Sequence, residues 1–174
     1  MGRPVVVLLL CALTVVFAAG CSRPVTQVQT LPTGPLDKAA YVRAFDVSAA
    51  GLAPRYGIGK ELPPGAPAAR QRERVTALQR LLRDWAGRLA GLQPPAAARP
   101  AQDRYVAGIR GFAGDLERVR GALARGDVKG ADALLKSGQV VSAGTRADLV
   151  AARRAFHALG YDLQDLDTAP VTTP

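Results

Sequence analysis

Few side chains in this sequence have both the type and the spacing that catalysis or metal binding requires. His157 is the only histidine. Ser142, Asp148 and His157 include the residue types of a Ser-His-Asp triad, but nothing in their spacing indicates one. Transition-metal sites usually combine several His, Cys or clustered carboxylate ligands. We therefore expect no catalytic residue and no metal site, and interpret His157 as a surface or partly packed side chain beside Phe156.

The carboxylates are also dispersed. The three glutamates lie in different segments, at Glu61, Glu73 and Glu117. Three aspartates gather near the C-terminus, at Asp162, Asp165 and Asp167. A loose tail does not preorganise a catalytic pair, so solvated charge is the favoured role, with weak calcium binding by the tail as the alternative.

Two patterns concern anions. The run GIGK at 57–60 has the glycines and lysine of a phosphate loop but lacks its full spacing, its Ser/Thr and a preceding strand, so we expect a flexible loop. The best candidates for an anion-binding face are five arginines: Arg118, Arg120, Arg125, Arg153 and Arg154. Because successive helical positions diverge around the axis, scattered solubilising charge is the favoured interpretation.

The strongest motif is at the N-terminus, MGRPVVVLLLCALTVVFAAGC. Arg3 gives a short positive region, and residues 5–17 form an apolar stretch of signal-peptide length, shorter than the ~20 residues of a membrane span. Three small residues at 18–20 then precede Cys21. This pattern resembles the bacterial lipobox, although its first position is more often leucine than the Ala18 found here.

The resemblance implies a lipoprotein. Cleavage would fall between Gly20 and Cys21, the Cys21 sulfur would carry a diacylglyceryl group, and the freed amine would accept a further acyl chain. Two or three chains make an anchor stable, because each buried methylene contributes ~0.8 kcal/mol. Cys11 would leave with the leader. We therefore expect the chain on the extracytoplasmic face of the cell membrane; the alternatives are an ordinary secreted protein and an uncleaved anchor.

The formal net charge of +9 bears on the partner. An exported protein does not meet the genome, so we expect no nucleic acid. Anionic lipid head groups, acidic envelope polymers or an envelope protein are the natural partners. The favoured alternative is that arginine coats the solvent side of helices.

The remaining chain divides into a tether at 21–35, a domain at 36–163 and a loose tail at 164–174. The tether is polar and contains proline, and its residues 22–35 would reach roughly 45 Å when extended. Helical periodicity covers 37–49, 67–92, 100–124, 127–138 and 141–159, while 50–66 has too much Gly and Pro to be regular.

The long helices each carry an apolar seam, with spacings of three and four residues. In the segment 67–92 the seam comprises Val75, Leu78, Leu82, Trp85, Leu89 and Leu92. In 100–124 it comprises Tyr105, Ile109, Phe112, Leu116, Val119 and Leu123. The shorter segments place Tyr41, Phe45, Val128, Ala131, Leu134, Leu135, Leu149, Ala152, Phe156 and Leu159 inward. These seams, with no alternating segment, predict an all-α antiparallel bundle of about four helices.

Several residues mark helix ends. Asp37 and Asp127 are expected N-caps, and Gly160 is an expected left-handed stop after which Tyr161 packs back on Phe156. Four glycines lie off the seam of 100–124, at 108, 111, 114 and 121, and each costs ~1 kcal/mol relative to alanine. They either allow a close neighbour or soften that helix.

The segments DKAAYVRAFD, LAGLQPPAAAR, ALARGD and FHALGYDL are similar to parts of small helical lipoproteins and secreted proteins of the actinobacterial kind. The resemblance implies a helical fold and an envelope location, and no reaction. In such proteins a cysteine after the first helix often pairs with one after the final glycine turn. Here those regions read VSAAGL and GYDLQD, without cysteine, so packing alone must hold the first helix.

The sequence therefore predicts a non-enzymatic, membrane-tethered module, without a cofactor, that binds another envelope component. One alternative is a carrier whose bundle holds an apolar ligand or lipid. Another is an enzyme acting on envelope polymers, which would need a carboxylate pair that the sequence does not flag.

Overall fold

The structure is a computed structural model that describes residues 34–48, 50, 52–55 and 65–163. All regular elements in these ranges are helical, and the predicted all-α class is confirmed. The leader, Cys21, the tether as far as 33, the GIGK run and the tail from 164 lie outside the described residues.

The helices follow the predicted segments closely. They are α1 (Lys38–Ser48), α2 (Leu52–Arg55), α3 (Ala68–Ala90), η1 (Ala96–Ala98), α4 (Arg99–Ala124), α5 (Val128–Lys136) and α6 (Ala143–Ala158). The one-turn α2 lies within the segment 50–66 that the sequence indicated as wholly irregular, so that expectation was wrong there. Leu52 explains it, because this side chain is only 1% exposed and burying it orders the turn around it.

Local chemistry sets the ends of several helices. The Asp37 carboxylate accepts the Ala40 N–H at 2.7 Å, and the Asp127 carboxylate accepts the Gly130 N–H at 2.8 Å, as N-caps do. Gly160 has a φ of 69°, the left-handed conformation that ends α6, and the Tyr161 N–H then donates to the Phe156 carbonyl. These three predicted caps are confirmed.

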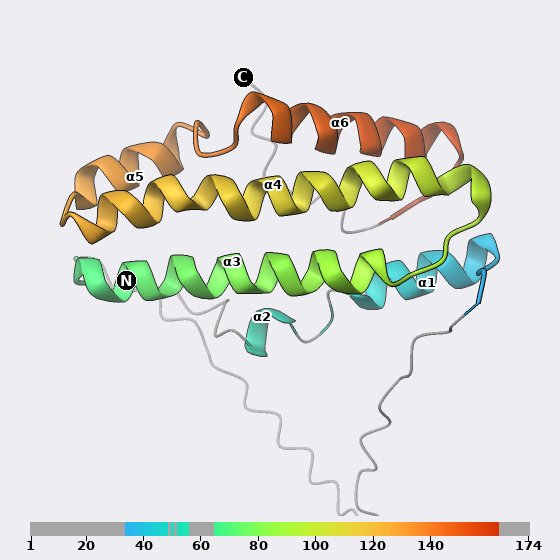
Figure 1. Cartoon of the computed structure of the whole chain (residues 1–174), viewed down its shortest axis with the longest axis horizontal. Coiled ribbons are helices and arrows are strands. Elements are labelled where there is room, and N and C mark those ends of the chain that lie inside the picture. Colours follow the sequence, from blue (N-terminus) through green and yellow to red (C-terminus); the bar gives the residue numbers. More distant parts are fainter. Residues whose placement is uncertain (1–33, 49, 51, 56–64, 164–174) are drawn as a thin grey trace, which may run out of the picture. The chain divides into compact units, whose positions relative to one another are not determined.

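α4 lies between α3 and α6 (Figure 1). Its contact with α6 depends on Gly108 and Gly111. A Cβ at Gly108 would lie 2.7 Å from Leu149 Cδ2, and one at Gly111 would lie 2.5 Å from Thr145 Oγ1. Both glycines therefore allow close approach, whereas Gly114 has open space around it. The α3 side of α4 lies roughly opposite, given 100° of rotation per residue.

α1 covers one end of this arrangement with aromatic side chains. Tyr41 and Phe45 are fully buried against Phe156, with ring centroids at 6.3 and 5.9 Å. Tyr161 lies 5.8 Å from Phe156, as predicted, and burial raises the pKa of the Tyr41 hydroxyl. The Lys38 ammonium donates to the Leu159 carbonyl at 3.0 Å and so joins α1 to the end of α6. The expectation that packing alone holds the first helix was wrong, because this contact and hydrogen bonds from Trp85 and Arg88 to Ser48 hold it as well.

Most residues of the predicted seams are buried, several are only partly buried, and two are exposed. Leu135 is 48% exposed and Leu159 is 37% exposed, so the expectation that they point inward was wrong. Both stand within the last turn or just past the end of a helix, where no neighbouring helix covers them. Leu78, Trp85 and Phe112 are only partly buried, because Gln79 and Ala86 occupy the centre of the α3 contact instead.

Candidate functional site

The residues of the imagined triad are not brought together. Ser142 N-caps α6, where its hydroxyl accepts the Thr145 N–H at 3.3 Å. His157 is exposed near the other end of the same helix, about 22 Å away by helical rise. Asp148 lies between them along α6. Ser142 thus has a structural role in starting the helix.

The carboxylates remain apart as well. Glu73 is exposed on α3, Glu117 is on α4, and Asp162 is exposed after α6, while Glu61, Asp165 and Asp167 lie outside the described residues. Within the described part of the chain, no three His, Cys, Asp or Glu side chains gather in a way that could hold a metal ion.

The five predicted arginines do not form one surface. Arg118 donates to the carbonyls of Gln139 and Val140 at 2.8 and 2.7 Å, which secures the α5–α6 connection. Arg120 donates to Glu117, and part of Arg153 is buried. Arg125 at the end of α4 and Arg154 on α6 are exposed on different elements.

A different group of arginines gathers where α3 packs on α4. Two contacts set the register of this antiparallel pair. The buried Gln79 amide donates to the Ala113 carbonyl at 2.9 Å, and the Trp85 and Tyr105 rings are 5.9 Å apart. The position four residues after Gln79 on α3 therefore lies opposite the position about four residues before Ala113 on α4.

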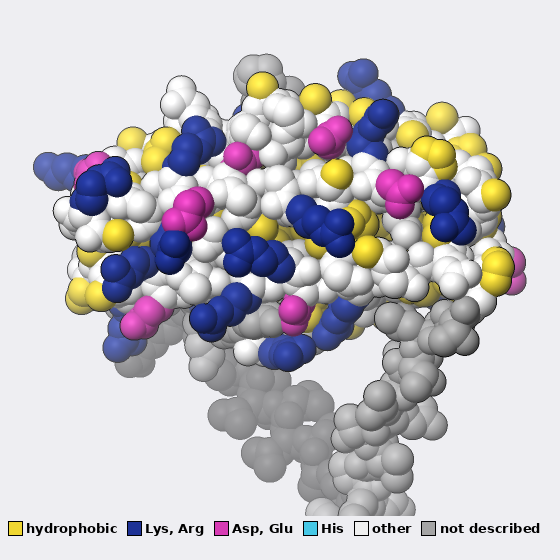
Figure 2. Space-filling model, viewed as in Figure 1, with side chains coloured by type: hydrophobic (Ala, Val, Ile, Leu, Met, Phe, Trp, Pro, Cys, Tyr) yellow, Lys and Arg dark blue, Asp and Glu magenta, His cyan; other side chains and the backbone are white. Residues whose placement is uncertain are grey.

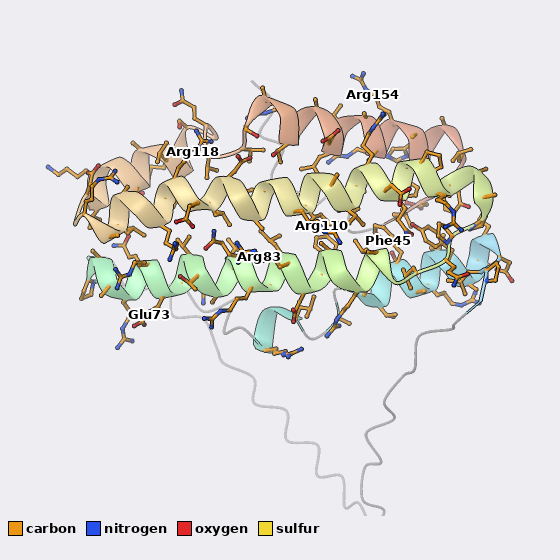
Figure 3. The ribbon with its side chains drawn as sticks, in the orientation of Figure 1. Phe45, Glu73, Arg83, Arg110, Arg118 and Arg154 are labelled. Carbon is orange, nitrogen blue, oxygen red and sulfur yellow. The ribbon has the colours of Figure 1, made fainter. Side chains whose placement is uncertain are left out.

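This register places Arg83 beside Arg110 (Figure 3). Arg72 lies about three helical turns before Arg83 and on the same side of α3, and it falls across from Arg120. We call the exposed group Arg72, Arg83, Arg110, Glu117 and Arg120 the α3–α4 basic surface. It lies on the side of the helix pair away from Trp85 and Tyr105. Figure 2 shows dark blue side chains along both helices on this face, with fewer magenta ones between them.

The one carboxylate of this surface is already engaged. Arg120 Nε donates to the Glu117 carboxylate at 2.8 Å, and the Gln79 amide approaches it at 3.5 Å. The Arg120 hydrogen bonds, together with the positive charges of Arg120 and Arg83, hold the pKa of Glu117 below its usual value. The surface as defined thus contains four arginines and one carboxylate, and only Arg120 and Arg83 interact with that carboxylate. The guanidinium groups of Arg72, Arg83 and Arg110 make no hydrogen bond or salt bridge with any residue in the described ranges.

Small residues surround the central pair of arginines. Gly87 and Ala90 follow Arg83 on α3, and Ala107 and Gly114 flank Arg110 on α4; all four are exposed. A Cβ at Gly87 or Gly114 would meet nothing within 4 Å. The two guanidinium groups therefore stand on a surface of low relief, where a broad anionic partner can reach both.

A second candidate is a cleft of 610 Å³ between α4 and α5, whose lining includes Arg118, Arg125, Glu117 and Asp127. Most of its charged groups have intramolecular roles: Arg118 binds two carbonyls, Glu117 binds Arg120, and Asp127 caps α5. Gly121, Ala122, Gly130 and Leu134 complete its lining, so the cleft offers few charged groups that are not already engaged.

Asp115 is partly buried, and its surroundings change the pKa of its carboxyl group, but its role is structural. Its carboxylate accepts the Ser142 N–H at 2.8 Å across the α4–α6 contact. Burial opposes the charged form, yet hydrogen bonds from Ser142 and Thr145 prevail, so the pKa of Asp115 lies below its usual value.

The chain matches no protein-family model, no curated protein and no solved structure. No helix in the described ranges has the length and apolar character that crossing a membrane requires.

Sequence reasoning missed the α3–α4 basic surface because its members come from two segments whose register is a tertiary property. One usable signal was present. Arg72 and Arg83, like Arg99 and Arg110, are spaced by about three turns, which keeps each pair on one side of its helix.

Proposed function

We propose that this chain is a membrane-anchored lipoprotein of the cell envelope whose helical domain binds another envelope component without catalysing a reaction. The observation that carries the binding role is the α3–α4 basic surface. The guanidinium groups of its arginines Arg72, Arg83 and Arg110 are exposed and make no hydrogen bond or salt bridge in the described chain. Groups left uncompensated in this way favour binding of an anionic partner.

The anchoring part of the proposal rests on the N-terminal sequence. The apolar stretch, the three small residues and Cys21 have the order that lipidation needs, and the polar tether separates Cys21 from the helical domain. A tether of this length lets any side of the domain turn towards the membrane or an adjacent envelope component.

Intact mass spectrometry of the protein extracted from membranes tests the anchor. We expect the mass of residues 21–174 plus lipid, and loss of the lipid in Cys21→Ala. The mass of an unmodified chain would contradict anchoring through Cys21.

Crosslinking in cells tests the binding role. The tethered protein is crosslinked, purified and compared with Cys21→Ala. We expect an envelope component that is enriched with the tethered form and lost in the variant. Recovery of an apolar ligand beyond the anchor, with no other component, would instead support the carrier.

A further inference from the structure

We propose that the α3–α4 basic surface docks onto a membrane surface rich in anionic phospholipid, so that the tethered domain lies against the bilayer through Arg83 and Arg110. This inference rests on the proposed function, because the anchor is what keeps the domain close to lipid. It goes further by naming the surface and the chemistry of its partner.

The first reason is the charge of this surface. Arg72, Arg83 and Arg110 are exposed and carry no salt bridge, while Glu117 is held by Arg120. A basic side chain near an anionic leaflet contributes about 1 kcal/mol. Three uncompensated arginines therefore correspond to roughly 3 kcal/mol, or about a hundredfold in the occupancy of the docked state.

The second reason is the way the arginines are presented. Arg83 and Arg110 come from two antiparallel helices, and Arg72 lies about 16 Å along α3 from Arg83. The neighbouring exposed residues have small side chains that do not project beyond the arginines: Gly87, Ala90, Ala107 and Gly114. A surface of this breadth fits several lipid head groups at once better than one enclosed small anion, which requires a concave pocket.

The third reason is that part of the opposite side of the helix pair is already occupied by α1. There Trp85 and Arg88 are engaged with the end of α1, through the Ser48 hydroxyl at 2.8 Å and the Ser48 carbonyl at 3.2 Å. On the side that carries Arg83 and Arg110, neither guanidinium has a hydrogen-bond or salt-bridge partner in the described chain.

The test uses the chain as cells produce it, incorporated into vesicles of phosphatidylglycerol and phosphatidylcholine or of phosphatidylcholine alone. A thiol is introduced in Gly87→Cys, on the basic surface, or in Ala147→Cys, at an exposed position of α6. The rate of labelling by a membrane-impermeant maleimide reports whether each position is covered.

We expect labelling of Gly87→Cys to be slowed about tenfold or more on phosphatidylglycerol vesicles at low salt, and to recover at high salt, because screening weakens exposed electrostatic contacts. Adding Arg83→Gln and Arg110→Gln should abolish the slowing. The matched control, Lys129→Gln with Arg154→Gln, removes the same charge from α5 and α6 and should preserve it. Ala147→Cys should label equally on both vesicles.

Equal labelling of Gly87→Cys on the two vesicles would overturn the proposal. So would slowing that appears only when soluble polyphosphate is added to phosphatidylcholine vesicles, because it would assign the surface to an anionic polymer. Intact mass of the same sample reports lipidation of Cys21 separately. A lipidated chain with no slowing contradicts docking alone, whereas a chain without lipid contradicts the anchor.

Discussion

The two sides of the α3–α4 pair differ in whether the rest of the described chain covers them. On one side, Trp85 donates to Ser48 and packs on Tyr105, and α1 covers the aromatic side chains. On the other side, Arg83 and Arg110 are exposed among small residues, with no salt bridge to the described chain. The covered side contributes buried contacts to the fold, and we expect the exposed arginines of the uncovered side to contribute little to stability. Binding to an external partner is therefore the role we assign to the uncovered side.

The largest effect should come from the covered side. Phe156→Ala removes a fully buried ring that lies within 6.5 Å of Tyr41, Phe45, Tyr105 and Tyr161. We expect the free energy of unfolding to fall by about 3–5 kcal/mol in urea titration. A loss below about 1 kcal/mol would mean that the aromatic cluster does not hold α1 in place.

The glycines of α4 give the next largest effect, with a control on the same helix. Gly108→Ala places a methyl group against Leu149 and should lower the free energy of unfolding by about 1–3 kcal/mol. Gly114→Ala has open space and should raise it by about 0.5–1 kcal/mol. Thermal and urea unfolding of both variants check this pair, and equal changes would show that the α4–α6 contact is not close.

Asp115 gives the α4–α6 contact a pH dependence. Its pKa is lower in the folded state, so its contribution to stability is complete above the unfolded value, near pH 4, and is lost as the pH falls through the folded value. We expect Asp115→Asn to lower stability by about 1–2 kcal/mol at pH 7 and by less below pH ~4. Asp162→Asn, at an exposed position after α6, is the control and should change the free energy of unfolding at pH 7 by no more than about 0.5 kcal/mol.

The smallest effect on stability should come from the uncovered side. Arg83→Gln with Arg110→Gln should change the free energy of unfolding by no more than about 0.5 kcal/mol, as substitutions of unpaired surface residues do. Arg118→Gln loses two hydrogen bonds to carbonyls and should cost about 1 kcal/mol or more. A large loss in the double variant would show that these arginines serve the fold.

Much of the fold could be predicted because it depends on local chemistry. Asp37, Asp127 and Gly160 act within a turn of their own positions, so the sequence nearby was sufficient. The α3 seam was only partly predictable. Gln79 is 3% exposed because its amide reaches the Ala113 carbonyl, a partner that hydrophobicity along one helix does not reveal.

The candidate site was harder to predict for a related reason. The arginines chosen from sequence were neighbours along α4 and α6, and Arg118 proved to be used by the carbonyls of Gln139 and Val140. Arg83 and Arg110 are distant in sequence, and they lie side by side only because of the register in which α3 packs on α4. No periodicity within either helix specifies that register.

Binding through the uncovered side is tested most directly by identifying which side of the helix pair contacts the partner in cells. A photo-crosslinking amino acid is placed at Ala90, on the uncovered side of α3, or at Ala147, an exposed position on α6. We expect crosslinked envelope material from position 90, lost with Arg83→Gln and Arg110→Gln, and little from position 147. Equal yields from both positions, or a yield from 90 that survives the arginine substitutions, would contradict binding through the uncovered side.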